Sequence, residues 1–357
     1  MQALKKMDRS FRSNLVTYGM VLLAWLLVGL ASSAGLISNS LQGQLVPICT
    51  YVVLAVSLNL TVGILGELSL GHAGFMSVGA FFGSVLWLCI SGSVPGWLGL
   101  VLSMLLGGAV AGLFGLVIGI PVLRLQGDYL AIVTLAFGEI IKNIFNAVYL
   151  GIDSRGLHFS MSDSASLGLE AEGKVLINGA IGITGITKVS SFTAGVLLVL
   201  VTLFVVLNLV HSRAGRAIMS IRDNRIAAEA TGINVTKYKL MAFITSAVFA
   251  GMAGVLYALN MSTVVAKKFD YNTSILVLVF VVLGGMGNIR GSIIAAAVLT
   301  VLPELLRSVA DYRMLVYAVL LILMMIFTQS PQLLAARERL FGLVRRGKGP
   351  AGKKGEV

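Results

Sequence analysis

Uninterrupted apolar runs of about 20 residues recur along most of this 357-residue sequence. An α-helix of that length crosses the core of a bilayer, which is about 30 Å thick. Hydrophobic residues make up 57% of the chain and charged residues 12%, whereas a soluble domain is about 45–50% apolar and 25% charged. The chain is therefore expected to fold in a lipid membrane.

The apolar runs are typical of helices rather than of a membrane β-barrel. A barrel strand is about ten residues long and alternates in polarity, but the run TYGMVLLAWLLVGLASSAGLI does not alternate. The expected fold is all-α, a polytopic membrane protein of about ten transmembrane helices, and the first apolar run is expected to be retained because it is too long for a signal-peptide core. The expected segments are residues 15–37, 45–65, 75–90, 96–122, 129–148, 192–209, 240–259, 274–284, 292–305 and 314–327.

Basic residues flank the apolar segments, which is the distribution that orients membrane helices. Most of the 27 Lys and Arg residues fall on the inner side if the N-terminus is cytoplasmic, so both termini are expected in the cytoplasm. This distribution explains the net charge of +12 without nucleic acid. The resulting domain prediction is a cytoplasmic N-terminus (1–14), a transmembrane permease domain (15–329) with an external loop (150–190) and a cytoplasmic loop (211–239), and a basic cytoplasmic tail (330–357).

Two glycine-rich stretches interrupt the helical pattern, GILGELSLGHAGF and VLGGMGNIRGS. Irregular backbone at membrane depth is tolerated only beside protein or water, and paired interruptions in two halves are typical of transporters built from repeats. We therefore expect a weak internal repeat and treat Glu67, Ser69 and His72 of the first stretch as candidates for the translocation path. The alternative is that Glu67 is hydrated near the cytoplasmic interface and that His72 only satisfies a helix end.

The segment 129–148 carries a polar stripe at helical spacing, formed by Glu139, Lys142, Asn143 and Asn146, and it also contains Thr134. Ionisable groups at membrane depth usually face the interior of a bundle or water, so Thr134 and Glu139 are further path candidates. The favoured alternative is structural, because Glu139 and Lys142 are three residues apart and can pair with each other.

The cytoplasmic loop contains GRAIMSIRDNRIAAEATGINVTKYK. Asp223 is placed to cap a short helix and Gly232 to end it in a left-handed turn, which predicts a helix of about two turns. Such a helix can dock in a groove of another protein, whereas the alternative is a solvated linker. The candidate docking residues are Arg222, Asp223, Ala227, Ala228, Glu229, Ala230 and Gly232.

The sequence has no phosphate-binding Gly-Lys-Ser or Gly-Lys-Thr and no zinc-protease motif. Its three histidines are widely separated, and its two cysteines, Cys49 and Cys89, lie in apolar runs, so neither a disulfide nor a metal site is expected. No cofactor and no catalytic site are predicted, and any ATP would have to be hydrolysed by a partner.

Three segments carry a family resemblance. AAEATGIN, followed by an apolar helix, resembles the Glu-Ala-Ala loop of ATP-binding-cassette importer permeases in a variant order. LNLTVGILGELSLGHAGFMSVGA and LRLQGDYLAIVTLAFGEIIKNI, with RDNRIAAEATGINVTKYKLMAFITSAVFAGMAGVLYA, resemble the branched-chain amino-acid permeases over residues 45–300. The stretch DYLAIVTLAFGEI is similar to the LivM-type rather than the LivH-type member.

The resemblance implies a non-enzymatic subunit of the bacterial inner membrane that imports branched-chain amino acids by alternating access. Its implied partners are a LivH-type second permease, two cytoplasmic ATPase subunits and a periplasmic or extracellular substrate-binding protein. One alternative is the same type of importer for urea or another small acid or amide. The other is an ion-coupled secondary carrier, whose coupling would depend on intramembrane acids such as Glu139.

Overall fold

The computed structural model describes residues 2–35, 38–123, 128–169 and 173–306, together with the single positions 315, 318, 319 and 322. The chain divides into two compact units, Met1–Val301 and Leu302–Val357, and the first contains the helical bundle. Apart from those single positions, the tenth predicted segment (314–327) lies outside the described residues, as does the predicted tail (330–357).

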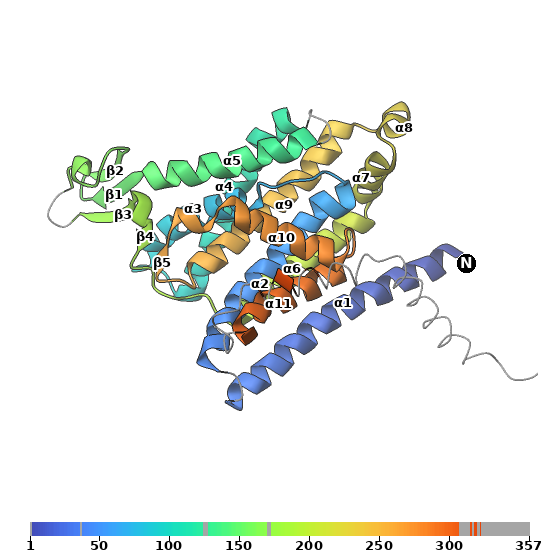
Figure 1. The fold of residues 1–357 in the computed structure, drawn as a ribbon, viewed down its shortest axis with the longest axis horizontal. Helices are drawn as coiled ribbons and strands as arrows, with labels where there is room; N and C mark the ends of the chain where they lie inside the picture. The colour runs from blue at the N-terminus through green and yellow to red at the C-terminus, as the bar shows by residue number, and fades with distance from the viewer. Residues whose placement is uncertain are drawn as a thin grey trace, which may run out of the picture. The chain divides into compact units, whose positions relative to one another are not determined.

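Seven helices in the described part of the chain are long and apolar enough to cross a membrane. They correspond to the first seven predicted segments, and each is labelled in Figure 1. Their bounds are α1 (Gln2–Ser33), α2 (Asn39–Asn59, continued by the π-helix η1, Leu60–Leu65), α3 (His72–Ile90), α4 (Gly96–Val122), α5 (Asp128–Ala147), α6 (Phe192–His211) and α9 (Val235–Ala258).

The next two predicted segments form shorter helices. Helix α10 (Tyr271–Gly284) has 14 residues and α11 (Ile289–Leu305) has 17. At 1.5 Å per residue they are about 21 and 26 Å long, less than the core of a typical bilayer. The protein is thus polytopic and mainly helical, and the expected number of about ten spans is not confirmed.

Small residues let three helices of the core approach closely. Gly79 of α3 lies against Gly251 of α9 and Gly107 of α4, and a Cβ atom at Gly79 would overlap the backbone of Gly251. A Cβ at Gly254 of α9 would likewise overlap the carbonyl of Met76. Such small-residue contacts are how helices pack in a membrane, where burial of apolar surface provides no driving force between them.

The predicted external loop departs from the all-helical expectation. Strands β1 (Tyr149–Asp153), β2 (Gly156–Ser160) and β3 (Lys174–Asn178) form an antiparallel sheet in the order β2-β1-β3. A second pair, β4 (Ile183–Thr184) and β5 (Thr263–Val264), joins this loop to the connection after α9. Outside the apolar runs the backbone is free to pair between strands, since it no longer has to satisfy itself within one helix.

The predicted cytoplasmic loop folds into two helices, α7 (Arg213–Asp223) and α8 (Arg225–Ala230), which lead into α9. Figure 1 shows α7 and α8 together at one end of the bundle and the sheet β1–β3 at the other. Ser212 begins α7 by accepting a hydrogen bond from the amide of Gly215 at 3.1 Å. The buried side chains of Ile218 and Ile221 hold α7 against its neighbours.

Candidate functional site

Helix α8 is short, and it is capped by a side chain at its start and by a glycine turn at its end. Asn224 caps its start, because its Oδ1 accepts a hydrogen bond from the amide of Ala227 at 3.0 Å. The prediction that Asp223 would be the cap is wrong: Asp223 is the last residue of α7, while Asn224 has the extended backbone that an N-cap requires. The predicted end is confirmed, since Gly232 has a φ of +82° and donates to the carbonyl of Glu229 at 3.0 Å.

The two faces of α8 differ. Ile226 is 80% exposed, and Ala227, Glu229 and Ala230 are exposed as well. Arg225 and Glu229 form an ion pair along the same surface, with Nε and Oε1 3.1 Å apart. Ala228, expected on this outer surface, instead packs inward against Ile221 and Val235. One side of α8 is thus fixed to the loop, and the other is free to contact a second protein.

The first glycine-rich stretch is a genuine break in the helix. After Asn59 the chain continues as the π-helix η1, which ends at Gly66 with a φ of +81°. The amides of Gly66 and Glu67 both turn back to the carbonyl of Thr61. π-helical segments are rare and are frequently found at functional sites.

Two basic residues, one at the end of α7 and one in the first turns of α9, bond to this break. Arg222 donates from Nη1 to the carbonyl of Gly63 at 3.2 Å, and its Cγ lies 2.5 Å from the position that a Cβ at Gly66 would occupy. Lys239, at the start of α9, pairs through Nζ with Oε1 of Glu67. Glu67 is therefore held by an ion pair. Neither predicted role of Glu67, lining the path or being hydrated near the interface, included this pairing.

The two glycine-rich breaks touch each other. Asn59 accepts a hydrogen bond from the amide of Gly287 at 2.8 Å and donates one to Ser292 Oγ at 2.9 Å. A Cβ at Gly63 would overlap the backbone of Gly287. Sequence reasoning missed Asn59 and Lys239, although a buried Asn and a buried Lys in or beside apolar helices are the kind of signal that marks such sites.

A buried polar cluster surrounds the start of α3. Nε2 of His72 lies 2.7 Å from Ser246 Oγ, which in turn donates to the carbonyl of Ser57. Thr134 Oγ1 accepts from the amide of Leu70 at 3.0 Å. Within the described residues, Ser69 Oγ and His72 Nδ1 are buried without a hydrogen-bond partner. The structure thus brings Ser69, His72 and Thr134 together at the start of α3. Two of their polar atoms have no hydrogen-bond partner among the described residues.

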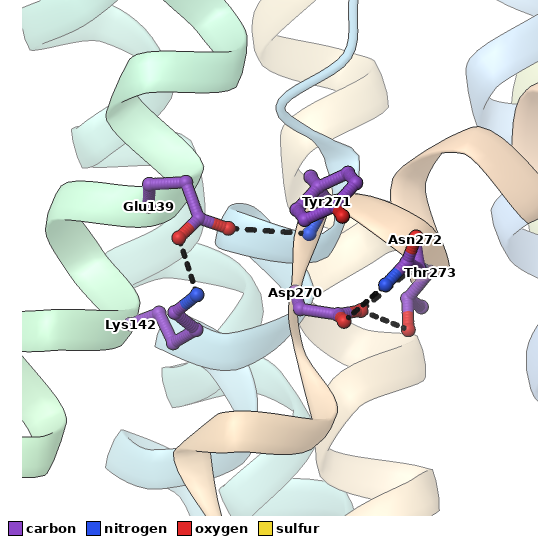
Figure 2. A network of polar contacts seen from close by, with 6 residues as sticks. All are labelled: Glu139, Lys142, Asp270, Tyr271, Asn272 and Thr273. Atoms are coloured by element: carbon purple, nitrogen blue, oxygen red, sulfur yellow. Dashed lines mark hydrogen bonds and ion pairs between the residues drawn. The ribbon is translucent and has the colours of Figure 1, made fainter.

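Glu139 belongs to a different network, shown in Figure 2. It pairs with Lys142, as the spacing predicted, and its Oε1 accepts a hydrogen bond from the amide of Tyr271 at 3.3 Å. Its contacts therefore join α5 to the start of α10, whereas those of Glu67 reach α9. The structure does not bring these two acids into one site.

Asp270 caps α10 within the same network (Figure 2). Its Oδ1 accepts from the amide of Thr273 at 3.0 Å and its Oδ2 from Asn272 Nδ2 at 2.8 Å. Partial burial by itself would raise the pKa of Asp270, but these hydrogen bonds and the nearby Lys142 ammonium hold that pKa below its ordinary value. The carboxylate form is the one that this site stabilises.

Comparison with known proteins gives a consistent picture. A family model described as "Branched-chain amino acid transport system / permease component" matches residues 40–328. The chain is 34% identical over 308 residues to the high-affinity branched-chain amino acid transport system permease protein LivM of Salmonella typhimurium, covering 81% of this chain and 69% of that protein. The Escherichia coli LivM protein is 33% identical over the same coverage.

More distant relatives transport other cargo. The ribose import permease protein RbsC of Escherichia coli is 28% identical over 130 residues, which is 34% of this chain and 40% of that protein. No solved structure matches the chain significantly.

Proposed function

Because this chain belongs to the family of permease components of branched-chain amino-acid transport systems, and is a multi-pass protein of the bacterial inner membrane, we propose that it imports branched-chain amino acids by alternating access. In this proposal it pairs with a LivH-type permease and two cytoplasmic ATPase subunits. A periplasmic or extracellular binding protein delivers the amino acid, which crosses without chemical change.

Helix α8 is the observation that supports this proposal most. It is fixed to the loop by Ala228 and presents Ile226 to solvent at the end of the bundle opposite the sheet β1–β3. An apolar side chain that is 80% exposed on a capped helix is suited to fill a pocket on a partner protein. We infer that this pocket belongs to an ATPase subunit, whose closure on ATP displaces α8.

We propose that the polar cluster at the start of α3 lines the translocation path. Ser69 and His72 retain a buried polar atom that is unpartnered within the described residues, and each such atom costs about 1–3 kcal/mol unless something pairs with it. Together with Thr134 they offer hydrogen bonds to the polar end of an amino acid. Glu67 and Glu139 are already ion-paired, so we assign them to positioning these elements.

Docking is tested with Ile226→Asp, which places a charge in the proposed contact. We expect this variant to lose co-purification of the ATPase subunits because a buried unpaired charge is strongly unfavourable at an interface. Leu157→Asp is the matched control, since Leu157 is 67% exposed on β2 at the opposite end of the bundle. Equal retention of the ATPase by both variants would contradict α8 as the docking element.

Transport is tested by reconstituting the complete complex in liposomes. We expect leucine uptake that requires ATP and that falls strongly with Gly232→Val, because a β-branched residue is strained at a φ of +82°. Leucine uptake without ATP would indicate an ion-coupled carrier instead. Uptake of urea but not of leucine would retain the importer and change its cargo.

A further inference from the structure

Both flanks of helix α8 are tied to the same short break in the membrane domain. Arg222 precedes α8 and reaches the carbonyl of Gly63, while Lys239 follows α8 and reaches the carboxylate of Glu67. Gly63 and Glu67 are four residues apart, on either side of the end of η1. A displacement of α8 therefore acts on this one segment through both contacts.

The two contacts differ in how firmly they are held. The Lys239 side chain is 5% exposed and that of Glu67 17%, whereas the Arg222 side chain is 40% exposed. Arg222 also bonds to Asp223, with Nη2 and Oδ1 2.9 Å apart. Lys239 is thus a buried anchor, and Arg222 is a solvated contact whose guanidinium can exchange partners as the loop moves.

The segment between these contacts departs from α-helical geometry. Residues 60–65 form a π-helix, whose hydrogen bonds span five residues where those of an α-helix span four. A change between the two registers rotates and shifts the chain that follows. An element with two packed arrangements, rather than a flexible hinge, is what converts a small displacement into a switch.

The segment also contacts the second glycine-rich break. Asn59 bonds to the Gly287 amide and to Ser292 Oγ, and the backbones of Gly63 and Gly287 are in contact. Because glycine at position 63 leaves no side chain between the two breaks, a register change in η1 displaces the α10–α11 break directly.

From these contacts we propose that Arg222 and Lys239 form a two-point clamp that transmits displacement of α8 to η1 and from there to the break at Gly287. Both are positioning residues, since they act through the backbone of η1 and through Glu67. The inference rests on the proposed function, because it takes α8 to be the element moved by the ATPase.

The test measures ATP hydrolysis and leucine uptake on the same reconstituted complex. We expect Arg222→Ala and Lys239→Met to lower the leucine transported per ATP about tenfold, while ATP hydrolysis continues. Arg216→Ala and Lys237→Met are matched controls: Arg216 bonds to the carbonyl of His211 within its own loop, and Lys237 is exposed two residues before Lys239. Both controls should keep the ratio of the unaltered protein.

Charge exchange separates coupling from folding. The double variant Glu67→Lys with Lys239→Glu retains an ion pair and should recover most of the ratio that Lys239→Met loses. Variants that keep the normal ratio, or that lose hydrolysis and uptake in proportion, would overturn the clamp while leaving the importer intact. An unaltered complex that imports leucine without ATP would overturn the proposed function and the clamp with it.

Discussion

The molecule has two polar networks that are built differently. The clamp joins partners that are 159 residues apart (Arg222 with Gly63) and 172 residues apart (Lys239 with Glu67). The second network, called here the Glu139 network (Figure 2), centres on a pair three residues apart on one helix, Glu139 and Lys142. One network holds distant segments together, whereas the other is mainly local and adds a single bond from Glu139 to α10.

Exposure separates the two lysine–glutamate pairs as well. The side chains of Lys239 and Glu67 are 5% and 17% exposed, and those of Lys142 and Glu139 are 18% and 29% exposed. Solvated ion pairs contribute about 0–1 kcal/mol, whereas removing one partner of a buried pair costs about 3–5 kcal/mol. A lysine–glutamate pair should therefore contribute more to stability between Lys239 and Glu67 than between Lys142 and Glu139.

Lys239→Met is expected to have the largest effect on stability. It leaves the Glu67 carboxylate without its partner in a largely buried site, so we expect a loss of about 3–5 kcal/mol. Thermal unfolding of the purified protein in detergent measures the change. Adding Glu67→Gln should recover much of the loss, and a Lys239→Met variant as stable as Lys142→Met would abolish the contrast between the two networks.

Asn59→Ala is expected to rank second. It removes the buried hydrogen bond to Ser292 and the partly buried one from the Gly287 amide, a loss of about 1–3 kcal/mol. Asn272→Ala is the matched control, since its side-chain bond to Asp270 in the Glu139 network is exposed. Comparable melting temperatures for the two variants would argue against a structural link between the breaks.

Asp270 makes the Glu139 network dependent on pH. The pKa of Asp270 is lowered on folding from 3.8, so its contribution to stability is present above that value and is lost as the pH falls through the lower folded-state pKa. Asp270→Ala should remove the cap and about 1 kcal/mol at pH 7. Melting curves between pH 7 and pH 3 should show a smaller acid-induced loss in the variant than in the unaltered protein, and parallel curves would refute the assignment.

Lys142→Met is expected to have the smallest effect. Its pair with Glu139 is partly solvated, and Glu139 keeps its bond from the Tyr271 amide, so we expect a loss of about 0–1 kcal/mol. The same unfolding assay checks this value. A loss as large as that of Lys239→Met would show that the Glu139–Lys142 pair is as important for stability as the Lys239–Glu67 pair.

Local sequence predicted most of the membrane helices because a helix in lipid must satisfy its own backbone, and length and apolarity decide whether it can. The pairing of Glu139 with Lys142 and the turn at Gly232 were also predictable, because each depends on residues a few positions apart. The strands β1–β3 were not predicted, because their pairing depends on segments that meet only in the folded chain.

The sequence by itself determined seven apolar helices of this protein, the two glycine-rich breaks and the exposed loop that carries Glu229. Only the tertiary structure decided that Lys239 pairs with Glu67 and that Asn59 joins the two breaks. The physical reason is that these contacts depend on which helices pack side by side, and spacing along the chain does not record a partner more than 150 residues away.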